Sequence, residues 1–167
     1  MGHPVRGEIA FLVLRSKTDL HRYNGEMCRP SPEPAMDTFT VSTRQRNEFV
    51  DITPQIRESR RRRGLREGMG VVYCPHTTAA ITINEHCDPD VVHDMLLWLE
   101  RAVPHIQAGF RHGEGNSDSH IKASLVGSSA TVLVAGGELI LGRWQGVFLC
   151  EFDGPRTRTV QVQWVGA

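Results

Sequence analysis

The sequence predicts an α+β fold, built mostly from an antiparallel β-sheet or sandwich with two to three inserted helices. Short runs rich in β-branched and aromatic residues recur along most of the chain between turn residues, which is typical of strands. Helix boundary signals occur in only a few places between these runs, which favours α+β over a doubly wound parallel sheet. The chain also lacks the G-x-G-x-x-G and Walker A patterns of the common nucleotide-binding folds.

The first 35 residues differ from the rest of the chain. Segment 28–35, C-R-P-S-P-E-P-A, has the proline content of a linker, and a regular strand pattern begins directly after it at Met36. We therefore predict an N-terminal extension over residues 1–35, outside the domain, and one domain over residues 36–167. A chain of 167 residues with 40% hydrophobic content is long enough to bury one sizeable core.

The first half of this domain is predicted to hold four strands and one helix. By composition, the strands lie at 38–43, 47–52, 71–74 and 78–84. The short polar link between the first two predicts a hairpin. Thr53 is a candidate helix N-cap followed by Pro54, and Gly64 is a candidate stop. The four arginines before Gly64 could bind an anion, but neutral net charge and the absence of interleaved aromatics favour a solvated helix end that complements the dipole.

Two more helices are predicted in the middle of the chain. Asp88 caps the first, with Pro89 in its first turn and Pro104 after its end. Its apolar residues predict one broad stripe facing the core: Val91, Val92, Met95, Leu96, Trp98 and Leu99. The second helix covers about 118–126, with Asn116 or Ser117 as its cap and Gly127 as its stop.

The C-terminal third is predicted to be mostly strand. The strand runs are 130–135, 138–141, 146–152 and 157–165. Gly136-Gly137 between the first two is a hairpin signal. The last run alternates, with Val160, Val162 and Trp164 on one face and polar residues on the other, so it predicts a half-buried strand.

Bulk properties narrow the expected partners and the compartment. Lys plus Arg and Asp plus Glu both number 19, and this balance does not favour nucleic acid or a membrane surface as a partner. No apolar run approaches the ~20 residues needed to cross a bilayer. No two of Cys28, Cys74, Cys87 and Cys150 form a C-x-x-C pair, so we expect a reduced, cytoplasmic protein without disulfides.

Three histidines are the candidate metal ligands. His112 and His120 flank a loop of small and polar residues, and His76 opens the run H-T-T-A-A-I-T-I-N-E. Neutral imidazole is a common metal ligand, and a catalytic zinc needs three protein ligands and one open position. Glu85 and Asp94 lie nearby in sequence. Any one of these histidines could instead be a buried, hydrogen-bonded imidazole, but the shared polar loop favours a ligand role for His112 and His120.

Other candidate residues have both a structural and a binding interpretation. Trp144, in L-G-R-W-Q-G, is either a core residue, which we favour slightly, or the wall of a pocket for a flat ring, with Gln145 supplying polar contacts. Arg156 either grips a phosphate or pairs with Glu151. Lys122 would point to a different side of its helix from the histidine. No G-x-S-x-G elbow occurs, so nucleophilic acyl transfer is not expected.

Five stretches together resemble the YjbQ family, also described as secondary thiamine-phosphate synthase-like proteins. In chain order they are H-T-T-A-A-I-T-I-N-E (76–85), D-P-D-V-V-H-D-M (88–95), N-S-D-S-H-I-K-A-S-L-V-G (116–127), L-G-R-W-Q-G (141–146) and E-F-D-G-P-R-T-R (151–158). The resemblance covers roughly residues 36–167. It implies a YjbQ-like α+β fold assembled as a homotrimer, with a pocket near the subunit boundaries.

The resemblance also implies roles for the candidate residues. The metal or anion site would be formed by His76, His112 and His120. Catalytic roles would fall to Glu85, Asp94 and Lys122. Substrate contacts would come from Asn84, Trp144, Gln145 and Arg156. The expected partner is a small phosphorylated molecule, and the expected cofactor is a divalent metal.

The implied activity is weak thiamine-phosphate synthesis, which joins an aminopyrimidine diphosphate to a thiazole phosphate. Lys122, Arg143 and Arg156 are the cations that could hold the leaving pyrophosphate. That reaction suits Mg²⁺, which prefers oxygen ligands, whereas three histidines suit Zn²⁺. The alternatives are a metal-assisted hydrolase and a non-enzymatic trimeric protein that binds a metal or a small ligand.

Overall fold

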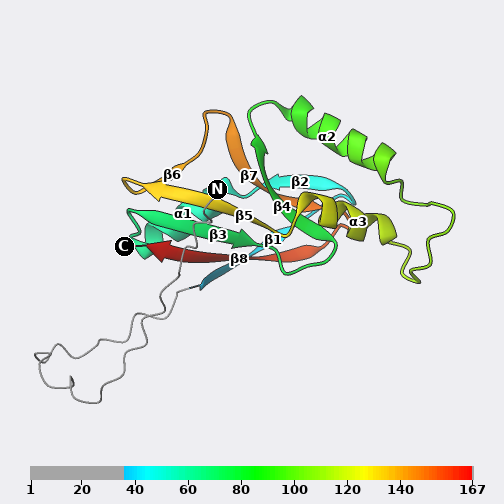
Figure 1. The fold of residues 1–167 in the computed structure, drawn as a ribbon, viewed down its shortest axis with the longest axis horizontal. Helices are drawn as coiled ribbons and strands as arrows, with labels where there is room; N and C mark the ends of the chain where they lie inside the picture. The colour runs from blue at the N-terminus through cyan, green and yellow to red at the C-terminus, as the bar shows by residue number, and fades with distance from the viewer. Residues whose placement is uncertain (1–35, 167) are drawn as a thin grey trace, which may run out of the picture. The chain divides into compact units, whose positions relative to one another are not determined.

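The computed structural model describes residues 36–166, which form two antiparallel sheets and three helices (Figure 1). The strands are β1 (Met36–Ser42), β2 (Glu48–Asp51), β3 (Gly68–Tyr73), β4 (Ala79–Glu85), β5 (Ser129–Ala135), β6 (Glu138–Ile140), β7 (Gln145–Glu151) and β8 (Thr157–Gly166). The helices are α1 (Thr53–Arg63), α2 (Pro89–Ala102) and α3 (Ser117–Val126). The predicted α+β class is therefore confirmed. The predicted extension at 1–35 lies outside the described residues.

The strands divide between a five-stranded sheet, in the order β1-β8-β3-β5-β6, and a three-stranded sheet, in the order β2-β7-β4. The predicted hairpin between the first two strands is wrong, because β1 pairs with β8 and β2 pairs with β7. The chain passes between the sheets several times, and two of these crossings are the β1–β2 and β7–β8 corners. The corners are tied together by hydrogen bonds from the Thr43 N–H to the Arg156 carbonyl (2.8 Å) and from the Gly154 N–H to the Arg46 carbonyl (3.0 Å).

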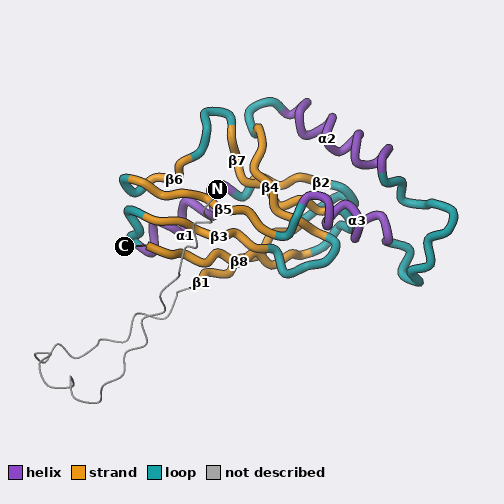
Figure 2. The backbone as a smooth tube through the Cα atoms, viewed as in Figure 1, coloured by secondary structure: helices purple, strands orange, loops and turns teal. Residues whose placement is uncertain are grey.

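The main hydrophobic core lies between the two sheets. It joins the inward residues of the five-stranded sheet, such as Val72 and Val162, to Ile81 and Leu149 of the three-stranded sheet, with Ile56 of α1. The other face of the three-stranded sheet contributes to a second, smaller cluster: Ala80, Phe148 and Cys150, with Leu99 of α2 and Ala123 of α3. The domain therefore has three layers. The helices α2 and α3 form the first, the three-stranded sheet the second and the five-stranded sheet the third, with the main core between the two sheets. Figure 2 shows α2 and α3 beside β4 and β2.

The helix ends largely match the sequence signals. Asp88 caps α2 by accepting a hydrogen bond from the Asp90 N–H (2.9 Å). Gly64 ends α1 in the left-handed conformation, with φ of 64°. The predicted cap of α1 is wrong by one residue: Ile52 is the N-cap, and the Thr53 hydroxyl instead accepts a hydrogen bond from the Val147 N–H (2.8 Å).

The α2 helix is buried less than its apolar stripe predicts. Among the residues of α2 only Leu99 is buried, and Trp98 is 64% exposed. A stripe shows only that a helix has an apolar side and not how much protein is available to cover it. Within residues 36–166, no helix is both long enough and apolar enough to cross a bilayer.

Candidate metal and ligand site

His112 and His120 lie together at the start of α3. Their ring centroids are 5.2 Å apart, and the rings are nearly perpendicular. His112 belongs to the loop before α3, which turns back through a hydrogen bond from the Gly115 N–H to the His112 carbonyl (3.1 Å). Gly115 has a φ of 71°, which favours glycine. This turn lets two histidines eight positions apart line one cavity.

That cavity has a volume of about 570 Å³ and combines imidazoles with a cation. Its walls are Gly109, Phe110, Arg111, His112, Ser117, His120 and Ile121. The first turn of α3 borders it through Ser117. Asn116, the N-cap residue, gives that turn no side-chain hydrogen bond: its amide nitrogen donates to Asp153 (3.0 Å), and its Oδ1 is buried without a partner among the described residues. A helix N-terminus and an arginine both attract anions.

His120 also lines a second cavity, of about 580 Å³, together with His76. The other walls include Tyr73, Cys74, Thr77, Ser124 and Ser128. The three predicted ligands therefore belong to two adjoining cavities that share His120. Among the described residues, no group of three or more His, Cys, Asp or Glu side chains lies close enough together to hold a metal ion.

The ring of His76 is occupied by the main chain. Its Nε2 accepts a hydrogen bond from the Thr159 N–H (2.8 Å). Burial, and then the positive charge of Arg158, lowers the pKa of His76, which fits a neutral ring with its proton on Nδ1. His76 would have to give up this bond to bind a metal through Nε2. His112 and His120 are therefore the better-placed ligands.

A buried ion pair lies next to His76. Both carboxylate oxygens of Glu151 accept hydrogen bonds from Arg158 (2.5 and 2.6 Å), and Arg158 also donates to Thr78 (2.8 Å). Glu151 is fully buried and Arg158 is 5% exposed. The predicted pairing of Arg156 with Glu151 is therefore wrong, because Arg158 is the inward residue of β8 at this corner.

A second ionic network holds Lys122 and Arg156. Lys122 is 1% exposed and donates to Asp118 (2.8 Å). Arg156 donates to Asp153 (2.6 Å). Arg46 donates to both of these carboxylates (2.8 Å to Asp118, 3.3 Å to Asp153) and so joins the β1–β2 corner to α3. Two of the three cations expected to hold phosphates are thus engaged with carboxylates.

We expect this network to make the fold sensitive to acid. Burial tends to raise the pKa of Asp118, but hydrogen bonds from Lys122 and His105 and the charges of Lys122 and Arg46 lower it from 3.8 to about 2. A lowered folded-state pKa stabilises the fold above the unfolded value, and this stabilisation is lost as pH falls toward the folded value. Urea unfolding should show a loss of about 2 kcal/mol between roughly pH 5 and pH 2 from this group.

The matched control for the acid experiment is Asp94→Asn, because the Asp94 side chain is 78% exposed. This variant should keep the acid-induced loss, whereas Asp118→Asn should be less stable at neutral pH and lose less on acidification. An Asp118→Asn chain with the wild-type pH profile would contradict the assignment.

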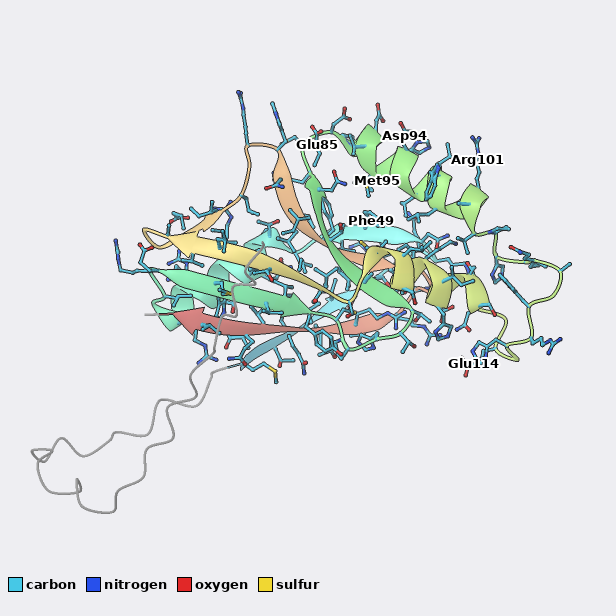
Figure 3. All side chains as sticks on the ribbon, in the orientation of Figure 1. Phe49, Glu85, Asp94, Met95, Arg101 and Glu114 are labelled. Carbon is cyan, nitrogen blue, oxygen red and sulfur yellow. The ribbon has the colours of Figure 1, made fainter. Side chains whose placement is uncertain are left out.

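The remaining predicted site residues gather at the far end of β4 from His76. In the sheet register Asn84 pairs with Gly146 and Glu85 with Gln145, which places Trp144 beside them. At about 3.3 Å per residue, β4 sets this end about 20 Å from its start near His76. Figure 3 shows Glu85 at this strand end and Glu114 in the distant loop before α3. One copy of the chain therefore does not bring Glu85 to the histidines.

Trp144 and Asp94 are both exposed. Trp144 is 52% exposed and lies 4.7 Å from the guanidinium carbon of Arg143, so the favoured core interpretation is wrong. The Gln145 side chain accepts a hydrogen bond from the Gly142 N–H (2.8 Å) and closes the loop between β6 and β7. Figure 3 shows Asp94 on the side of α2 away from the three-stranded sheet, and Met95 on the side facing it.

Sequence reasoning missed Arg111 and the Glu151–Arg158 pair. Arg111 directly precedes His112, so the signal was present but was not weighed. The partners of Glu151 and Arg158 depend on which strand residues face inward at a corner where the chain changes sheets. The three cysteines in the described part of the chain, Cys74, Cys87 and Cys150, are free thiols.

The chain matches the model of one protein family. The family is described as "UPF0047 protein YjbQ-like", and the match covers residues 37–167. The UPF0047 protein YugU of Bacillus subtilis is 47% identical over 131 residues, covering 78% of this chain and 99% of the relative. A UPF0047 protein of Methanocaldococcus jannaschii is 48% identical over 128 residues, covering 77% of this chain and 92% of the relative.

Solved structures show the same fold. An uncharacterized conserved protein of the YjbQ/UPF0047 family from Clostridium acetobutylicum superimposes with a TM-score of 0.76 at 46% identity, covering 77% of this chain and 99% of that one. A protein of unknown function from Sulfolobus solfataricus superimposes with a TM-score of 0.76 at 32% identity, covering 80% and 97%.

Proposed function

This chain belongs to the UPF0047 protein YjbQ-like family, and from that premise we propose that it is a metal-dependent protein that acts on a small phosphorylated molecule. His112 and His120 would supply two of the ligands of a divalent transition metal. The cavity they line would take the phosphorylated molecule. The observation that carries the proposal is that both imidazoles, Arg111 and the start of α3 border one cavity.

The donor set suits a transition metal. Imidazole nitrogen is a good ligand for zinc, copper, iron and nickel, whereas magnesium prefers oxygen. Such an ion would supply a Lewis acid that polarises a phosphoryl oxygen. Arg111 would bind the anionic end of the molecule, and the uncapped first turn of α3 would add N–H donors and the positive end of its dipole.

The cation pairings favour hydrolysis over the synthase reaction. Thiamine-phosphate synthesis needs cations to hold a leaving pyrophosphate, and two candidates, Lys122 and Arg156, are already in ion pairs. A metal-assisted hydrolase needs fewer cations, because the metal and Arg111 can serve one phosphate. We also propose that the chain self-associates, in line with the homotrimer that the family resemblance implies.

The test is metal content after purification in zinc-supplemented buffer. The wild-type chain should retain close to one zinc per chain, and His112→Ala and His120→Ala should each lose at least about tenfold in zinc affinity. Mass spectrometry of gel-filtered, folded protein measures the content. Inorganic phosphate should bind zinc-loaded wild type by calorimetry and should not bind the His120→Ala chain.

His93→Ala is the matched control, because that side chain is 71% exposed on α2 and lies outside the cavity. It should keep the wild-type zinc content. His76→Ala tests the three-histidine prediction in the same assay, because loss of zinc there would add His76 to the ligands. Unchanged zinc in both the His112 and His120 variants would refute the proposal.

A further inference from the structure

A straight row of exposed apolar side chains crosses the outer face of the five-stranded sheet. Val165 of β8 pairs with Met69 of β3 in the sheet register. Met69 pairs on its other side with Leu133 of β5, which in turn pairs with Ile140 of β6. Their exposed fractions lie between 43% for Met69 and 56% for Val165. Directly paired side chains on one face are neighbours, so these four residues form one apolar patch, the sheet row.

The rest of this outer face is almost without charge. The outward positions of β1 and β8 carry mainly threonine and glutamine. Glu138 of β6 is the one charged residue at an outward position of the five described strands. By contrast, 23% of the residues in the chain are charged. Depletion of charge marks the buried part of protein interfaces, so this face has the composition of a contact surface and not of a solvated one.

A second apolar surface lies between α2 and α3. It is a groove of about 680 Å³, here called the α2–α3 groove, lined by Val91, Asp94, Met95, Trp98, Leu99, Leu125 and Val126. Two of its large side chains project into solvent, since Trp98 is 64% exposed and Leu125 is 63% exposed. Exposed tryptophan and leucine on the rim of an apolar groove are typical of binding surfaces.

One copy of the chain cannot bring these two surfaces together. The α2 and α3 helices pack on the face of the three-stranded sheet that carries Phe148 and Cys150. The opposite face of that sheet carries Val147 and Leu149 and packs through the main core onto the five-stranded sheet. The sheet row lies on the outer face of the five-stranded sheet, the face that points away from the main core. The two surfaces therefore lie on opposite sides of the layered domain.

We propose that the sheet row of one copy of this chain packs into the α2–α3 groove of a second copy. Stable domains cover an apolar sheet face with a layer of helices. Within residues 36–166 the sheet row has no helices over it, and the α2–α3 groove has no sheet against it, so each surface can cover the other. The dimensions agree: the 14-residue α2 is about 21 Å long, and five strands span about 19 Å. In plan the sheet face offers about 450 Å², and its accessible area is larger than this because side chains project from it; a stable interface buries ~800 Å² per partner.

Such a contact is head-to-tail, because it joins two different surfaces. Head-to-tail contacts close into a ring where the rotation between copies allows it. These two surfaces would be the ones that join the copies in the self-association proposed above, on which this contact rests. This contact is independent of the metal site. A variant that no longer binds zinc can still assemble, and a variant that no longer assembles can still bind zinc.

The experiment uses two complementary variants, Leu133→Glu in the sheet row and Trp98→Glu in the groove. The wild-type full chain should sediment as an oligomer in analytical ultracentrifugation. Each variant alone should be monomeric, because a buried unpaired carboxylate should raise the dissociation constant by about a hundredfold or more. An equimolar mixture should form a one-to-one heterodimer, because one intact row can meet one intact groove.

Three results would overturn the inference: a monomeric wild type, variants that assemble like the wild type, or monomeric variants that fail to associate when mixed. The last result would indicate contacts between like surfaces. Ile106→Glu is the matched control, because Ile106 is 86% exposed and lies outside both surfaces. Thr131→Glu adds a charge next to the row without removing an apolar group, and it should also prevent assembly. Circular dichroism checks that every variant is folded.

Discussion

Replacing Glu151 with glutamine is expected to lower the free energy of unfolding by about 3 to 5 kcal/mol, one of the two largest effects that we expect from a single substitution. Glu151 is fully buried and accepts two hydrogen bonds from the Arg158 guanidinium (2.5 and 2.6 Å). It also accepts hydrogen bonds from the Phe152 and Asp153 N–H groups (3.0 and 2.9 Å). Neutralising it leaves the charge of Arg158 buried without an opposite charge at the corner where β7 leads into β8.

Urea unfolding monitored by circular dichroism measures this loss, and thermal unfolding should show a midpoint lowered by about 10 °C or more. The matched control is Glu58→Gln, which removes a glutamate from the exposed ion pair with Arg61 (2.9 Å). That variant should have close to wild-type stability, because solvent screens the pair. Equal stability of the Glu151 and Glu58 variants would show that burial of the Glu151–Arg158 pair has little energetic consequence.

Replacing Lys122 with methionine is the second substitution with a large expected effect, and it separates a structural role from a catalytic one. Methionine keeps most of the buried stem of Lys122 but removes the ammonium that contacts Asp118 at 2.8 Å. Asp118 then stays fully buried with only Arg46 and His105 as its charged or ionisable partners. We expect a loss of about 3 kcal/mol in the free energy of unfolding.

A double-mutant cycle isolates the interaction. Combining Lys122→Met with Asp118→Asn removes both charges, so the double variant should recover about 1 to 3 kcal/mol relative to the sum of the single losses. Zinc content per folded chain should stay at the wild-type level in the Lys122 variant. A stable Lys122→Met chain that no longer binds zinc or phosphate would support the catalytic role that the family resemblance implies.

Elements with local signals could be predicted from the sequence. The Asp88 cap, the Gly64 stop and the hairpin at Gly136-Gly137 each depend on neighbouring residues, and the structure has all three. The alternation of Val160, Val162 and Trp164 also identified the buried face of β8, where all three are less than 10% exposed. These features follow from backbone conformation and strand geometry, which short stretches of sequence determine.

The candidate site could be predicted only in part. The loop sequence pointed to His112 and His120, and their rings do lie 5.2 Å apart. His76 was expected as the third ligand, but its Nε2 accepts a main-chain hydrogen bond from β8, a strand more than eighty residues later in the chain. Glu85 and Trp144 belong to the opposite end of β4, because strand length sets their distance from His76 and sequence proximity does not.

By itself, the sequence determined the fold class, most element boundaries, the family and the pair of histidines beside the polar loop. Only the tertiary structure decided that β1 and β2 belong to different sheets, that Arg158 and not Arg156 pairs with Glu151, and that Trp144 is exposed. The physical reason is that caps, turns and alternation are fixed by interactions within a few residues. Strand partners, ion pairs and burial depend instead on which distant segments share a core. The same local sequence pattern is compatible with several ways of pairing and packing those segments.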